Sequence, residues 1–275
     1  MKLSAYPASA LSAAAPGPVH DLRDLTVDEL KLDVFYRPVV AEARARFALF
    51  RLLDQNYQDW ASHLNSLLSP LPLDDHAAAL GLDRLLLNYL HGAYALRLHF
   101  ETSFQQRFRT DSSEQKKYKM LVDQLGQTSW PFAFFLDFRG HLQHRGLAIG
   151  HFKRTVTPTS VVVELTWSGA DLQKFIKDWP RSKLTASRGT LEIVPLVREF
   201  HARLMDNYAH IILKTFFADL VPAADFYKKL AAEVRHAHPA LSMVFRDGVS
   251  KAADPKLVFV PNDLFAELGL APVAK

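Results

Sequence analysis

The amino-acid sequence predicts a mainly α-helical protein, a bundle of long helices with a small antiparallel β-sheet in the C-terminal half of the chain. Apolar side chains recur every three or four residues from Val34 to Leu68 and again within 195–220, which indicates amphipathic helices. After Gly146 the periodicity changes, because Ser160 to Trp167 is rich in the β-branched residues that favour strands. The long helices need each other's apolar faces, so we expect intimate packing rather than two domains on a linker.

The composition is that of a folded soluble protein. The 275-residue chain has 49% hydrophobic and 23% charged residues, enough to bury a sizeable core. A formal net charge of +4 is compatible with nucleic-acid binding but does not require it. Without cysteine there is no disulfide or thiolate metal site, so a reducing cytoplasm is the simplest compartment. No uninterrupted apolar run reaches the roughly 18 residues of a membrane span, so no membrane contact is expected.

The first 20 residues are rich in alanine, serine and proline. Prolines interrupt them and a sustained Leu/Val core is missing, so we interpret residues 1–20 as a flexible tail rather than as a signal peptide. The folded part is expected to begin near Thr26, which with Glu29 fits a capping box.

Residues 21–150 are expected to form a helical bundle, and residues 151–275 an α+β region packed on it, with a helix at 195–220 completing the bundle. Pro38 is expected to break or kink the first long helix. Further helices are expected from His76 or Asp83 to Phe108, over 112–127, from Pro131 onward, at 170–179, at 222–238 and after Asn262. Strands are expected at 152–156, 160–167, 241–245 and 257–260.

The most distinctive stretch ends the helix that Pro131 opens, and it reads Phe138-Arg139-Gly140-His141-Leu142-Gln143-His144-Arg145-Gly146. On an ideal helix Arg139 and His144 are about 140° apart, so a single helix does not bring them together. A two-fold pair of such helices would place an arginine and a histidine in a shared cleft. That cleft suits a phosphodiester, because guanidinium groups bind phosphate oxygens and imidazole carries protons near neutral pH. Simple C-terminal capping by the basic residues is the alternative.

The spacing Arg139-x-x-x-x-His144 at the end of an aromatic-rich helix resembles the HEPN superfamily, whose members carry an arginine followed four to six residues later by a histidine. The string Phe138-Arg139 followed by Leu142-Gln143-His144-Arg145-Gly146-Leu147 is similar to the signature of a bacterial HEPN-like group. Leu87 to Leu90 and Ala93 to Leu96 resemble the helix that packs beside the motif in that group. The resemblance covers roughly residues 20 to 150, and Gly140 departs from the polar residue that commonly follows the arginine.

The resemblance implies a HEPN-like bundle and a metal-independent endoribonuclease of bacterial toxin or anti-phage systems, working as a homodimer on RNA without a cofactor, with an antitoxin or other neutralising protein as partner. It implies that His144 exchanges a proton and Arg139 stabilises the phosphate, leaving a 2′,3′-cyclic phosphate and a 5′-hydroxyl. His141, Gln143 and Arg145 would help to bind the substrate. A non-catalytic HEPN-like dimeric binding or scaffold module is the alternative.

The preceding helix carries His99 and Glu101, which we expect to turn a polar edge toward the motif helix; ordinary solvated contacts are the alternative. The sequence contains no phosphate-cradling glycine loop, zinc-binding His-Glu-x-x-His helix or dinucleotide fingerprint. The tight histidine pairs lack carboxylates or thiolates at matching spacing, so no metal site is expected.

Overall fold

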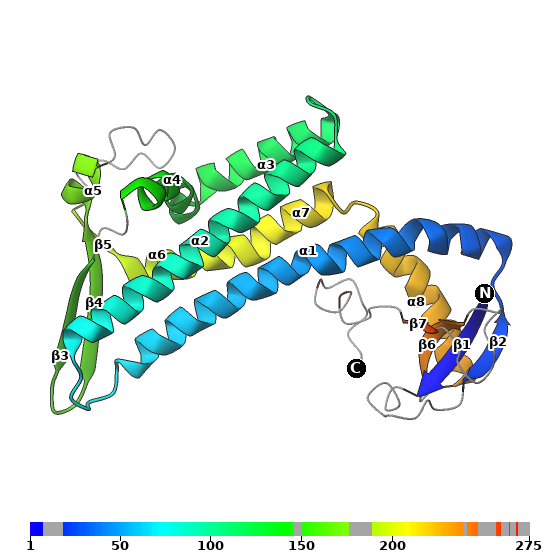
Figure 1. Ribbon diagram of the computed structural model, residues 1–275, viewed down its shortest axis with the longest axis horizontal. Coiled ribbons are helices and arrows are strands. Elements are labelled where there is room, and N and C mark those ends of the chain that lie inside the picture. The colour runs from blue at the N-terminus through cyan, green and yellow to red at the C-terminus, as the bar shows by residue number, and fades with distance from the viewer. Residues whose placement is uncertain are drawn as a thin grey trace. The chain divides into compact units, whose positions relative to one another are not determined.

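The computed structural model describes residues 1–7, 19–145, 150–175, 189–238, 241–246 and 257–259, together with Leu264 and Leu268. The described chain is mainly helical and carries a small antiparallel sheet in its C-terminal half, which confirms the predicted fold class. The chain divides into a terminal unit, residues 1–46 and 217–275, and a central unit, residues 47–216. Helix α1 (Val27–Ser66) is continuous and contributes to both units (Figure 1).

The terminal unit is built on an antiparallel sheet with the strand order β2-β1-β6-β7. Its strands are β1 (Lys2–Pro7), β2 (His20–Asp24), β6 (Leu241–Arg246) and β7 (Leu257–Phe259). Leu3 pairs with Arg23 of β2 on one side and with Phe245 of β6 on the other. Helix α8 (Leu220–Ala237) packs on this sheet, where the rings of Tyr227 and Phe245 lie 6.1 Å apart.

The expected flexible tail is corrected at residues 2–7, because they form the inner strand β1, with Leu3 and Ser4 fully buried. Residues 8–18 of that tail lie outside the described residues. Strand β1 is stabilised by pairing with β6, which comes from near the other end of the chain. Because the pairing partner β6 is so distant in the sequence, residues 2–7 do not themselves show a strand pattern. Local sequence patterns therefore did not reveal the strand.

Helix α1 begins at the predicted capping box. The Glu29 N–H donates to Thr26 Oγ1 at 3.2 Å, and the Thr26 N–H donates to the Glu29 carboxylate at 2.8 Å. Contrary to the expectation of a break, the helix continues through Pro38. A proline inside a helix costs about 3 kcal/mol. Buried contacts on both sides of Pro38 offset this cost, including the hydrogen bond from Tyr227 Oη to Asp33 at 3.0 Å.

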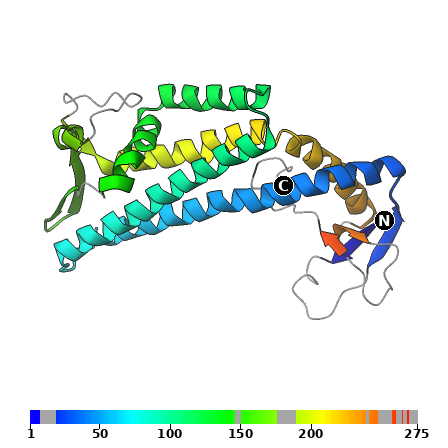
Figure 2. The ribbon, with the colours of Figure 1, turned by 45° about the horizontal axis from the view of Figure 1, so that its top comes forward.

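The helices of the central unit run lengthwise beside one another (Figures 1 and 2). They are the C-terminal part of α1, α2 (Asp75–Arg107), α3 (Ser113–Thr128) and a continuous run of α6 (Ile193–Ala202), the π-helix η3 (Arg203–Tyr208) and α7 (Ala209–Thr215). The Phe50 ring of α1 lies 5.8 Å from Phe100 of α2 and 6.3 Å from Tyr208 of η3. Helix α4 (Trp130–Arg145) packs against α2, α3 and α6.

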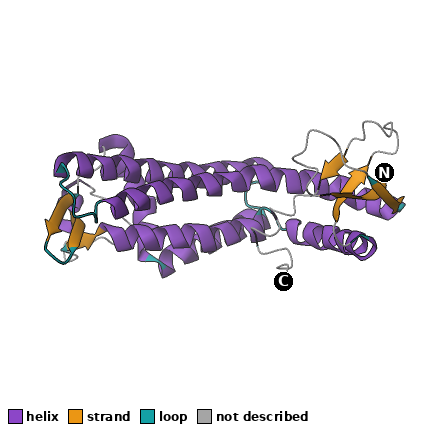
Figure 3. Cartoon of the chain, turned by 90° about the horizontal axis from the view of Figure 1, so that it is seen from below, coloured by secondary structure: helices purple, strands orange, loops and turns teal. Residues whose placement is uncertain are grey.

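A second antiparallel sheet, in the order β3-β4-β5, belongs to the central unit and lies at one end of its helices (Figure 3). Its strands are β3 (His151–Val156), β4 (Val161–Ser168) and β5 (Thr190–Glu192), and α5 (Gly169–Phe175) follows β4. The two strands expected at 152–156 and 160–167 pair as the β3–β4 hairpin, in which the Thr157 N–H donates to the Ser160 carbonyl at 2.8 Å. Strands β6 and β7 were expected to share this sheet, but they pair with β1 instead.

The two units therefore differ from the expected division at residue 150. Strands β3 to β5 belong with the central helices, because Trp167 of β4 is buried against the aromatic side chains of α4. The segment expected as a helix over 195–220 spans α6, η3 and α7 within the central unit, and Phe217 onward belongs to the terminal unit. The end of the helix expected at 170–179 and most of the one expected after Asn262 lie outside the described residues.

Candidate functional site

The arginine and histidine motif lies in the last two turns or so of α4. The helix is continuous from Arg139 through His144 to Arg145, so the backbone separates Arg139 and His144 by about 140° around its axis. The side chains of Asp137 and of residues 139–145 lie outside the described residues, as do residues 146–149. What the structure defines is therefore the helix that carries the motif and the side chains that hold that helix.

The turns of α4 before the motif are anchored by aromatic packing. The buried aromatic side chains are Phe132, Phe134, Phe135 and Phe138. The Phe135 ring lies 4.8 Å from Phe200 of α6, and the Phe138 ring lies 4.9 Å from Trp167 of β4. Helix α6 and strand β4 thus help to bury these aromatic side chains. Because Phe138 directly precedes Arg139, the motif begins where the aromatic anchor ends.

The start of α4 is held by a buried serine. The Ser129 hydroxyl donates to Glu199 Oε1 of α6 at 3.2 Å and accepts the Phe132 N–H at 3.4 Å. Ser129 is 1% exposed, so this pair of contacts ties the first turn of α4 to α6 inside the unit. Helix α4 is thus held at its start by hydrogen bonds and along the turns before the motif by the packing of aromatic side chains.

The polar residues expected beside the motif lie near the other end of the unit. Glu101 accepts a hydrogen bond from Arg97 Nε at 2.7 Å and lines a pocket at the α2–α3 turn. His99 is exposed, and its ring meets that of Phe100 edge-on at 5.8 Å. In Figure 1 the α2–α3 turn lies at the opposite end of α3 from α4.

The aromatic contacts explain this separation. The ring of Tyr89 on α2 lies 6.2 Å from Phe200, which Phe135 in the middle of α4 also contacts. Phe100, next to Glu101, instead shares Tyr208 with Phe132 at the start of α4, away from the motif. Glu101 follows Tyr89 by about three helical turns, or roughly 18 Å along α2. A pattern of polar residues along one long helix does not say which turn faces a partner, and the structure places Glu101 in the pocket at the α2–α3 turn.

A polar network that the sequence did not indicate centres on His201 of α6. His201 Nε2 lies 3.1 Å from Asp54 Oδ1 of α1, and Nδ1 lies 3.3 Å from Tyr89 Oη of α2. The Tyr57 ring stacks on the imidazole with centroids 3.8 Å apart and planes 7° from parallel. An ionised carboxylate only accepts, so in neutral His201 the Nε2–H donates to Asp54 and Nδ1 accepts from Tyr89.

This network joins three helices rather than offering a free base. Burial lowers the pKa of His201, and the nearby carboxylate of Asp54 opposes that shift only in part. Both ring nitrogens are engaged, so the imidazole has no vacant position for a substrate proton. Asp54, Tyr89 and His201 are far apart in the chain and belong to no motif, which is why no local pattern indicated the network.

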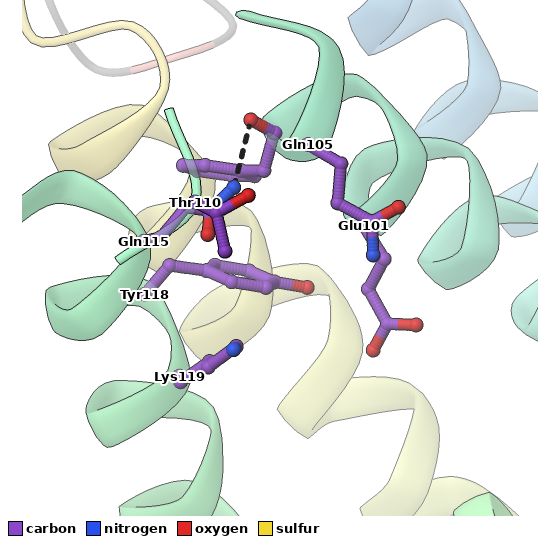
Figure 4. A pocket seen from close by; sticks show the side chains of 7 residues that line it. Glu101, Gln105, Thr110, Gln115, Tyr118 and Lys119 are labelled. Carbon is purple, nitrogen blue, oxygen red and sulfur yellow. Dashed lines mark hydrogen bonds between the residues drawn. The ribbon is translucent and has the colours of Figure 1, made fainter. Parts of the chain in front are cut away.

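The pocket that contains Glu101 has a volume of about 450 Å³. Its lining residues are Glu101, Phe104, Gln105, Thr110, Gln115, Tyr118 and Lys119, from α2, α3 and the turn between them (Figure 4). The hydroxyl of Tyr118, one of these lining residues, shares a buried hydrogen bond of 2.9 Å with that of Tyr208. Burial raises the pKa of Tyr118 to about 12, although this hydrogen bond acts in the other direction, so the hydroxyl is neutral at physiological pH.

Comparison of the chain with protein-family models, curated proteins and solved structures gave no match. In the part of the chain that the structure describes, no group of three or more histidine, aspartate or glutamate side chains is arranged to hold a metal ion. Each helix among the described residues lacks an apolar stretch of bilayer-spanning length.

Proposed function

We propose that the protein is a HEPN-type, metal-independent endoribonuclease that acts in a bacterial toxin or anti-phage system in the cytoplasm. The observation that carries the proposal is the position of the motif on α4. Phe138 is fully buried against Trp167, and Arg139 follows it directly. Catalysis needs reacting groups held at fixed spacing on a rigid element, and an aromatic-anchored helix supplies such an element. The resemblance of the motif to HEPN proteins supports the same function.

In the proposed reaction, the ribose 2′-oxygen attacks the adjacent phosphorus atom and the bond from phosphorus to the 5′-oxygen breaks. His144 exchanges a proton at the attacking 2′-hydroxyl or at the leaving 5′-oxygen, and Arg139 stabilises the charge that develops on the phosphate. His141, Gln143 and Arg145 help to orient the phosphate. The products are a 2′,3′-cyclic phosphate and a 5′-hydroxyl, and no metal or cofactor takes part.

The active form in this proposal is a homodimer. Arg139 and His144 lie about 140° apart on one helix, so a complete site is more easily built from two α4 helices than from one. A two-fold pairing would bring two copies of each residue into one groove. Arg139 and Arg145 of both chains would make that groove strongly cationic and suited to RNA.

Gly140 favours a second candidate function, a non-catalytic HEPN-like binding or scaffold module. HEPN motifs commonly have a polar residue after the arginine, and glycine has no side chain to orient the catalytic pair. In that case the same helix would contribute to a dimer or to a partner contact. RNA would then be bound without being cut, or would not be bound at all.

The two candidates are separated by incubating RNA with purified protein in the presence of a chelator. The endoribonuclease proposal expects cleavage by the wild type and its loss in His144→Ala and Arg139→Ala. His236→Ala is a matched control, since this exposed histidine of α8 belongs to the terminal unit and should leave cleavage unchanged. Equal cleavage by His144→Ala and the wild type would rule out the proposed role of the motif. Binding without cleavage would favour the scaffold module.

A further inference from the structure

The pocket at the α2–α3 turn, defined above by its lining residues, contains polar groups that the rest of the protein leaves unused. Its volume of about 450 Å³ lies within the range of about 300–1,000 Å³ that holds small ligands. Within the described part of the chain, the side-chain polar groups of Gln105, Thr110 and Lys119 form no hydrogen bond or ion pair. These groups are available to a ligand.

Gln115 gives the pocket a fixed hydrogen-bond acceptor. Its amide nitrogen donates to the Phe104 carbonyl at 3.3 Å and to the Phe108 carbonyl at 3.4 Å, so both amide hydrogens are used. Figure 4 shows the bond to Phe104. The side chain is 6% exposed, and its Oε1 has no hydrogen-bond partner among the described residues. An acceptor held in this way favours a ligand that donates hydrogen bonds.

Charges of both signs accompany this acceptor. The carboxylate of Glu101, held by Arg97 through Oε1, lies on one side of the pocket, and the ammonium of Lys119 lies on another (Figure 4). The pocket offers an ammonium group two acceptors, the Glu101 carboxylate and the Gln115 carbonyl oxygen. A carboxylate in the pocket would meet Lys119 and the Thr110 hydroxyl.

We propose that this pocket binds a small zwitterion of the α-amino acid class, with its ammonium toward Glu101 and Gln115 and its carboxylate toward Lys119 and Thr110. The aromatic floor does not suit a nucleobase, because the rings of Phe104 and Tyr118 stack on each other at 4.3 Å and are only 2% and 5% exposed. Base recognition by stacking needs an open ring face. The proposal does not depend on the endoribonuclease function.

The test is isothermal titration of the purified full-length protein with each of the common free amino acids at up to about 10 mM, which detects dissociation constants in the millimolar range. At least one amino acid should bind. The same amino acid as its amide, which lacks the carboxylate, and as its N-acetyl derivative, which lacks the ammonium, should each bind about tenfold more weakly or not at all.

Two variants make the test specific to the pocket. Lys119→Gln keeps an exposed polar side chain and should weaken binding about tenfold. Lys117→Gln is its matched control, an exposed lysine of α3 outside the pocket lining, and should bind like the wild type. The proposal is overturned if no amino acid binds, if either blocked derivative binds as well as the parent, or if Lys119→Gln binds unchanged.

Discussion

Arg154 of β3 donates a hydrogen bond from its Nε to the backbone carbonyl of Leu67, just beyond the end of α1, at 2.9 Å. The same guanidinium also donates to the carbonyls of Ser69 and of Leu71, the latter at 3.0 Å. Carbonyls at and after a helix end have no partner within the helix, so they need donors from elsewhere. One side chain of the hairpin thereby fixes the connection between α1 and α2.

Replacing this arginine should loosen that connection. Arg154→Ala removes a charged donor from three carbonyls, and we expect the free energy of unfolding to fall by about 1.5–3 kcal/mol. Arg154→Lys, which keeps the charge but lacks the planar fork, should lose part of that amount. Urea titration followed by circular dichroism measures both. A wild-type midpoint for Arg154→Ala would show that these hydrogen bonds do not stabilise the fold.

The acid stability of the terminal unit should depend on Glu29. Hydrogen bonds from Arg23 lower the pKa of Glu29 to about 2, although burial opposes the shift. A lowered carboxyl pKa gives stability that is present above about pH 4.5 and is lost as the pH falls toward 2. Glu29→Gln keeps a capping-box residue but has no charge to titrate. Its unfolding midpoint should therefore change less than that of the wild type between these pH values.

Asp28→Asn provides the control for this acid titration. Asp28 neighbours Glu29 in the first turn of α1, but its side chain is 89% exposed. In Asp28→Asn the unfolding midpoint should therefore change with pH as it does in the wild type. If Glu29→Gln also titrates like the wild type, the pairing with Arg23 does not contribute to acid stability.

His201 should make the central unit sensitive to mild acid. Burial lowers its pKa in the folded protein below the ordinary value of 6.5, so the unfolded chain binds the proton more readily. Its contribution to stability is complete above about pH 6.5 and is lost as the pH falls below that value. His201→Gln, which can donate and accept but does not titrate here, should lose less stability than the wild type between about pH 7.5 and pH 5.5. If the wild type and His201→Gln lost equal amounts of stability over this pH range, His201 would not be the source of the acid sensitivity.

The sequence predicted individual helices and strands better than it predicted which of them pair or pack with one another. The capping box at Thr26, the β3–β4 hairpin and the helix that ends in the motif follow from local patterns of a few residues, and the structure contains all three. Strand β1 was missed because its pairing with β6 joins opposite ends of the chain. The same limit applies to the candidate site.

Side chains on a long helix show which residues share a face, but not which turn of that helix meets a neighbour. Glu101 was therefore placed with the motif, whereas it lines the pocket beside α3. The His201 network was missed for a related reason, since Asp54, Tyr89 and His201 come from three helices and only tertiary packing brings them together.

Assembly provides a prediction of its own. If two α4 helices share one groove, light scattering at micromolar concentration should give twice the chain mass of 31.1 kDa. RNA affinity should fall steeply with added salt, because several arginines would displace counterions from the phosphates. Arg145→Gln should reduce the slope of that salt dependence. A 31.1 kDa species that binds no RNA at low salt would contradict the shared groove.

The most direct test of the central claim is the chemical identity of the ends that the protein leaves on RNA cut in the presence of a chelator. Mass spectrometry of the fragments should find 2′,3′-cyclic phosphates and 5′-hydroxyls for the wild type, and neither for His144→Ala. RNA carrying 2′-O-methyl groups should resist cleavage, because its 2′-oxygen cannot attack the phosphorus atom. Fragments with 3′-hydroxyl and 5′-phosphate ends, or intact RNA after incubation with the wild type, would contradict a metal-independent reaction carried out by Arg139 and His144.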